Sequence, residues 1–260
     1  MSTTDIGWTG MATSLILIVI AVALSWFNHL GLERSMLWAA LRAAAQLLVV
    51  GSALTLVFDA TASIWWAWAW VAGMIVVAAA TVRWRAREVP GAFSLALVAL
   101  VAVAVVSLGT IFWLGIFPLE AQAIIPLAGM NIGNAMAACV VVSRRIVAGM
   151  ADKRDEIEAR LALGQPWPVA SRPYVREALR TALLPQIEST KAVGLIALPG
   201  AMTGLILAGV APAQAVRIQV AVMYLILGSV ATSVTVVGIG LTRRLFTSDH
   251  RMVALARQTD

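Results

Sequence analysis

Polar side chains that interrupt long apolar segments are the residues in this sequence with most capacity for chemistry. Asn131 and Asn134 stand three apart in one apolar run, and Gln46 stands in another. An amide in lipid must find a hydrogen-bond partner, so these side chains should point into the protein. They could join neighbouring helices or line a path for a solute, and the sequence leaves both interpretations open.

The Pro199-Gly200 dipeptide lies in mid-segment, where it should break a helix. Broken helices within membranes often mark transport sites, although a kink that serves packing alone is the alternative. Methionines nearby could add thioether contacts, but they could equally fill gaps in the core. The candidate pathway residues are therefore Gln46, Met130, Asn131, Asn134, Met136, Pro199, Gly200, Met202 and Thr203.

No catalytic set accompanies these residues, and we expect a transport subunit rather than an enzyme. The predicted spans contain no Asp, Glu or His, which leaves no general acid–base pair and no site for a hard metal ion. Cys139 is the only cysteine, so an internal disulfide is excluded. The sequence also lacks a P-loop motif for ATP, and we expect no cofactor in this chain.

The composition requires a membrane. Of 260 residues, 61% are hydrophobic and only 12% are charged, against about 25% in an ordinary soluble domain. A crossing helix needs about 20 apolar residues. Seven segments qualify, at roughly 10–27, 38–58, 63–82, 92–114, 121–142, 192–210 and 216–241. We therefore predict an all-α, polytopic fold with one permease domain over 1–260, and a small extramembrane segment over about 143–191.

The charge distribution predicts the orientation. With the C-terminus in the cytoplasm and the N-terminus outside, all of the 19 basic residues except Arg217 lie on the cytoplasmic side. The net charge of +6 is then explained by topology, and we expect no nucleic-acid partner. Glycines spaced four apart, Gly129 with Gly133 and Gly200 with Gly204, are expected to let helices approach closely.

The cytoplasmic segment 143–191 should fold into short helices. Asp152–Leu163 is predicted as a helix that ends at Gly164, with Glu156 and Arg160 as an ion pair. A rigid turn then leads to a second helix from Ser171. We predict that Ile157, Leu161, Gly164, Arg172, Arg176 and Arg180 contact a partner. The alternative is a basic face exposed to solvent or lipid, with the apolar edge on the membrane surface.

Two resemblances refine these expectations. Glu158-Ala159 followed by Gly164 loosely resembles the coupling loop of bacterial ABC importer permeases, which adds Glu158 and Ala159 to the coupling set. A closer resemblance, to the Fet-type iron-export permease family and the similar plant aluminium-tolerance permeases, covers nearly the whole chain. It rests on motifs that include 42–47, 126–136, 176–183, 198–204 and 208–219. Asn131, Ala201 and Ala211 depart from the usual family residues, and Gln219 joins the pathway set by this resemblance.

The resemblance implies a homodimeric permease subunit in the cell membrane. A separate P-loop ATPase would bind ATP and Mg²⁺, and the exported species would be iron or an iron compound. The alternative is a stand-alone secondary transporter or channel for a small solute or metal. The lack of carboxylates in the predicted spans weighs against proton-coupled transport.

Overall fold

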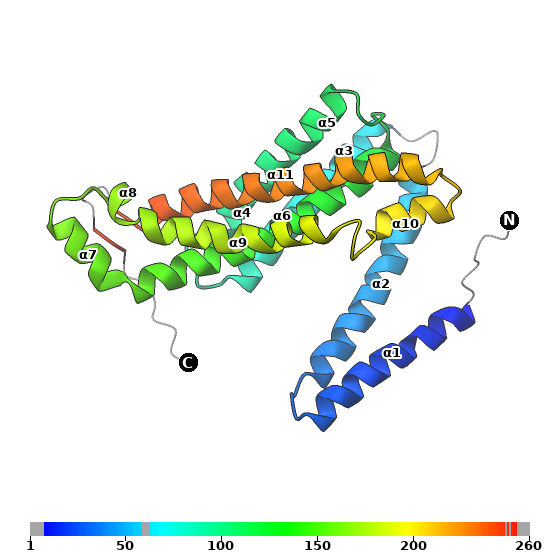
Figure 1. Ribbon diagram of the computed structural model, residues 1–260, viewed down its shortest axis with the longest axis horizontal. Coiled ribbons are helices and arrows are strands. Elements are labelled where there is room, and N and C mark those ends of the chain that lie inside the picture. Colours follow the sequence, from blue (N-terminus) through cyan, green and yellow to red (C-terminus); the bar gives the residue numbers. More distant parts are fainter. Residues whose placement is uncertain (1–7, 59–62, 248, 250, 254–260) are drawn as a thin grey trace. The chain divides into compact units, whose positions relative to one another are not determined.

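The computed structural model describes residues 8–58, 63–247, 249 and 251–253, and the regular elements in this part of the chain are helices. The chain divides into two compact units, residues 1–62 and residues 63–260 (Figure 1). The two units are described separately below. A single domain over 1–260 therefore stays a prediction.

The first unit is a helical hairpin. α1 (Trp8–Phe27) and α2 (Glu33–Val57) pack on each other. The turn between them needs positive φ angles at His29 (53°) and Gly31 (66°). The Ser25 hydroxyl donates to the Glu33 carboxylate at 2.8 Å and fixes the start of α2.

The second unit is built on long apolar helices. These are α3 (Ile64–Arg85), the run Ala92–Trp113, α6 (Ala121–Asp152) and α11 (Pro212–Arg244). The run comprises α4 (Ala92–Val103), a π-helical turn η1 (Ala104–Leu108) and α5 (Gly109–Trp113). Together with α2, five helices are long and apolar enough to cross a membrane, which confirms an all-helical, membrane-spanning architecture.

The predicted segment 192–210 is broken, as the Pro199-Gly200 dipeptide indicated, and it contains no helix of spanning length. α9 (Arg172–Ala192) ends where the predicted span begins, residues 193–199 are non-helical, and α10 (Gly200–Leu207) has only eight residues. Gly194 adopts a φ of 89°, and its N–H bonds the carbonyl of Ala197 at 2.9 Å. Pro199, which has no N–H, directly precedes α10. The break therefore exists, but it leaves a short helix after it.

The core of the second unit lies around α6 and α11. α6 contacts α3, α4, α9 and α11, while α11 also contacts α4, α9 and α10. Two glycines of α11 make room for their neighbours. Leu179 of α9 lies 2.6 Å from where a Cβ on Gly238 would be, and Leu95 of α4 lies equally close to that position on Gly240. These contact glycines are packing sites that sequence analysis did not predict.

At one end of this unit, basic residues of α6 and α11 contact the connection between α3 and α4. Arg144 of α6 forms a 2.8 Å ion pair with Glu88 in the α3–α4 loop. Arg244, at the end of α11, donates to the Gly91 carbonyl at 2.9 Å and to the Ser94 hydroxyl at 3.0 Å. Arg144 and Arg244, which were both predicted to lie on the cytoplasmic side, therefore lie at the same end of this unit.

A buried polar pair joins the two central helices. Asn131 of α6 is 1% exposed, and its Oδ1 accepts a hydrogen bond from the Ser229 hydroxyl of α11 at 2.8 Å. Its Nδ2 donates to the Leu127 carbonyl at 2.7 Å. Asn134, one turn away, is exposed and bonds only the backbone of its own helix in the described contacts.

We predict that Ser229→Ala lowers the free energy of unfolding by about 1 kcal/mol, because Asn131 then keeps a buried acceptor without its partner. Asn134→Ala is the matched control and should change it by less than about 0.5 kcal/mol. Denaturant unfolding in detergent micelles measures both. Equal effects of the two substitutions would show that the Asn131–Ser229 bond does not contribute.

Candidate transport path and coupling segment

The predicted pathway residues of α6 fall into two groups. Asn131 is enclosed between α6 and α11, the geometry of an interhelical hydrogen bond, which was the alternative interpretation. Asn134 is exposed, and Met130 and Met136 are half-buried, so these three reach a surface of the second unit. The structure thus gives different environments to two amides that stand only three residues apart in the sequence.

The glycines of α6 also differ. A Cβ on Gly129 would lie 3.3 Å from the Met74 methyl group of α3, so Gly129 marks a close approach of α3 and α6. No atom lies within 4 Å of the corresponding position on Gly133 or Gly204. If a helix packs closely on Gly133 or Gly204, that helix must lie outside the described part of the second unit.

The broken segment carries the remaining predicted pathway residues. Pro199 and Met202 are half-buried, whereas Gly200 and Thr203 are exposed. The Thr203 hydroxyl and N–H both point back to the Pro199 carbonyl, at 3.3 and 3.1 Å. Leu195 and Ile196 in the non-helical stretch are 93% and 86% exposed, and α10 buries none of its residues.

The two glutamines in the predicted pathway set, Gln46 and Gln219, differ in burial. Gln219 of α11 is buried at 4% exposure, within the second unit. Gln46 of α2 is exposed within the first unit, as is Arg42. Because Gln46 and the α6 residues belong to separate units, a path that they share stays a prediction.

The coupling segment matches its predicted helices. α7 (Arg154–Ala162) carries two ion pairs, Glu156–Arg160 at 2.9 Å and Arg154–Glu158 at 2.7 Å. The Tyr174 hydroxyl, and next the Arg160 guanidinium, lower the pKa of the Glu156 carboxyl below its ordinary value. Gly164 follows with a φ of 85°, the left-handed conformation that ends a helix.

One predicted contact residue is unavailable at the surface. Ile157 is 0% exposed because it packs inside this chain, so it cannot serve as the partner's apolar anchor. Leu161 is half-buried, while Glu158 and Ala159 are exposed. Leu163, which sequence analysis did not select, is 83% exposed at the tip beside Gly164. Leu163 lies at the end of α7 and not on the apolar edge formed by Ile157 and Leu161, so periodicity could not identify it.

α7 is connected to the helical core. The short helix α8 (Trp167–Ala170) replaces the predicted turn, and Trp167 stacks on Phe246, just past α11, with ring centroids 5.4 Å apart. Ser171 precedes α9, but its hydroxyl donates to the Trp167 carbonyl at 2.7 Å instead of capping that helix. A displacement of α7 would therefore pull on α8, α9 and the end of α11.

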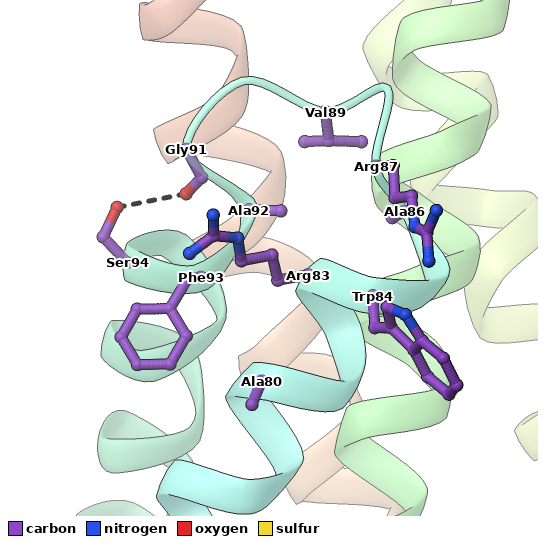
Figure 2. Close-up of a pocket in the computed structure, with 10 residues that line it drawn as sticks. All are labelled: Ala80, Arg83, Trp84, Ala86, Arg87, Val89, Gly91, Ala92, Phe93 and Ser94. Carbon is purple, nitrogen blue, oxygen red and sulfur yellow. Dashed lines mark hydrogen bonds between the residues drawn. The ribbon is translucent and has the colours of Figure 1, made fainter.

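Two surface hollows lie at basic positions. The first hollow lies at the start of α9, so the three arginines predicted to contact a partner, Arg172, Arg176 and Arg180, border a groove. Its other lining residues are Val169, Pro173, Glu177, Thr181 and Leu184. The second hollow, of about 790 Å³, lies at the α3–α4 connection (Figure 2). Arg83 reaches from α3 toward Gly91 and Phe93, while Arg87 lies 5.9 Å from the Trp84 ring. Within the described residues, no three His, Cys, Asp or Glu side chains are grouped to hold a metal ion.

Comparison with known proteins agrees with this architecture. The family model described as "Uncharacterised protein family (UPF0014)" matches residues 8–246. The rice UPF0014 membrane protein STAR2 is 40% identical over 216 residues, 83% of this chain and 75% of its own. Protein ALUMINUM SENSITIVE 3 of Arabidopsis thaliana is 34% identical, covering 87% of this chain and 83% of its own.

A bacterial relative has a similar length. The probable iron export permease protein FetB of Escherichia coli is 32% identical over 257 residues, 97% of each chain. No solved structure matches the sequence. The predicted resemblance to iron-export and aluminium-tolerance permeases is confirmed, and the chain belongs to the UPF0014 family of membrane proteins.

Proposed function

We propose that this chain is the membrane-spanning permease subunit of an ATP-binding-cassette transporter. It would act as a homodimer in the cell membrane and export iron or an iron-containing species. The cargo assignment is supported by the name of the E. coli relative, a probable iron export permease that aligns over 97% of both chains. The assignment to an ATP-driven class is supported by the helical segment between α6 and the broken region.

The observation that best supports an ATP-driven transporter is the exposed tip at Leu163-Gly164. This tip ends a helix that is stiffened by two ion pairs and connected through α8 to α9 and α11. An ATPase that moved the tip would displace the helix leading directly into the non-helical stretch 193–199. The sequence has no P-loop of its own, so ATP and Mg²⁺ would be bound by the partner.

A stand-alone secondary transporter or channel is the second candidate. The broken segment would suit either class, because both use interrupted helices at their sites. An exposed apolar tip on a charged cytoplasmic helix favours a protein partner, since such a tip has no evident role in a carrier that works alone. Reconstitution with and without the ATPase separates the two candidates.

The orientation gives the first test of this proposal. In a Cys139→Ala background, Lys153→Cys should react with a membrane-impermeant thiol reagent only in inside-out vesicles. Glu120→Cys, before α6, is the control and should react only in right-side-out vesicles. Labelling of residue 153 from the outside would contradict the cytoplasmic assignment of α7.

The tip gives the second test. Leu163→Asp should lower co-purification of the ATPase at least tenfold, because a carboxylate replaces the apolar contact at the centre of the interface. Val253→Asp, at a partly exposed apolar residue after α11, is the control and should leave co-purification unchanged. Co-purification is measured by affinity capture of the permease from detergent-solubilised membranes.

Cross-linking separates a docking tip from one that lies in lipid. In the Cys139→Ala background, Leu163→Cys should form a cross-link to the ATPase. If the cysteine at 163 reacts with no protein and Leu163→Asp binds the ATPase as well as wild type, this tip is not the coupling element.

A further inference from the structure

The depth of α9 can be established from its contacts. α9 runs alongside α6 and α11, in the direction opposite to α11 (Figure 1). Leu179 packs on Gly238, which fixes one point of register between α9 and α11. Nine residues further along α9 lies Glu188, and nine residues before Gly238 lies Ser229. Both helices rise about 1.5 Å per residue, so Glu188 lies near the level of Ser229.

Ser229 lies in the middle of the membrane-spanning part of α11. No charged residue occurs in α11 between Arg217 and Arg243, and Ser229 is close to the midpoint of that stretch. Its partner Asn131 is equally central in the uncharged part of α6. The sixth crossing therefore begins within α9, passes through the non-helical residues 193–199 and ends with α10. It starts well before residue 192.

This register brings a polar sequence into the membrane. Gln186, Glu188, Ser189, Thr190 and Lys191 form the last two turns of α9, interrupted only by Ile187. Glu188 and Lys191 form an ion pair at 2.9 Å, and their side chains are 61% and 67% exposed. Exposed charges and non-helical backbone are strongly unfavourable against lipid, because the hydrocarbon layer supplies no water to solvate them. Both must face protein or water.

We propose that the exposed polar side chains at the end of α9, Glu188, Ser189 and Lys191, line a water-filled translocation path between two copies of the chain. The pair Glu188–Lys191 has no net charge, and its two signs can each meet the opposite sign on a second copy across a two-fold axis. Facing copies therefore attract rather than repel. The inference rests on the proposed transporter function, and it assigns the path to charged, hydrophilic cargo rather than to an apolar or lipid one.

Water access gives the first test, and it needs neither ATPase nor cargo. In the Cys139→Ala background, cysteines replace Glu188, Ser189 and Lys191 one at a time. A methanethiosulfonate reagent carrying a trimethylammonium group should label all three in intact membranes. Val77→Cys, a 67% exposed position in the middle of the wholly apolar part of α3, is the control and should stay unlabelled. Labelling of 188, 189 and 191 no faster than 77 would overturn the path.

The second copy is tested by cross-linking. A chain whose single cysteine is Ser189→Cys can cross-link through a short bifunctional thiol reagent only to another copy. A cross-linked dimer is expected. If instead Ser189→Cys cross-links only to a cysteine placed in α1 or α2 of the same chain, the first unit covers this face and the proposal is wrong.

Transport in proteoliposomes with the ATPase tests the charges, with ferrous iron as the probe. Glu188→Gln and Lys191→Gln should each reduce transport at least tenfold, since each leaves one unpaired charge in the path. The swap Glu188→Lys with Lys191→Glu retains the pair and should recover to within about threefold of wild type. Single variants with wild-type transport would overturn the role of the pair. Failure of the ATPase to bind would contradict the proposed function but would leave the labelling result intact.

Discussion

Polar groups in the hydrocarbon layer need partners, and that requirement determines how this protein is arranged. Asn131 meets it by bonding Ser229, which fixes α6 against α11 at mid-depth. α3, α4 and α9 pack against α6, and α4 and α9 also pack against α11, where Gly238 and Gly240 make room for Leu179 and Leu95. The same requirement makes the polar end of α9 and the non-helical backbone after it informative, because Glu188, Lys191 and most of residues 194–198 remain exposed within the second unit as described.

The apolar helices could be predicted from the sequence because length and hydropathy determine them almost alone. α2, α3, α6, α11 and the run Ala92–Trp113 agree with the predicted spans, although α6 and α11 extend further. The break at Pro199 was also predictable from residue type. What could not be predicted was the course of the chain before it. The sequence Gln186–Lys191 has the composition of a surface helix, and only its packing beside α11 indicates a membrane position.

The candidate site was predicted less completely, for two physical reasons. Spacing shows which residues share a helical face, but it does not show what that face contacts. Asn131 and Asn134 therefore seemed equivalent, yet one is buried against Ser229 and the other is exposed. Periodicity also marks apolar stripes without saying whether they are already covered. Ile157 is buried in its own chain, whereas Leu163, outside the stripe, is free to contact a partner.

These features connect coupling and transport in one account. The tip that we propose contacts an ATPase leads through α8 and α9 into the polar, broken segment that we propose as a crossing beside the central helices. Spin-label accessibility along residues 180–200 tests this account most directly, by comparing collision with a water-soluble nickel chelate and with lipid-soluble oxygen. A label at 188 should show a position near mid-depth together with high access to the nickel chelate. A label at 188 that reports the aqueous interface, or mid-depth with access to oxygen alone, would contradict it.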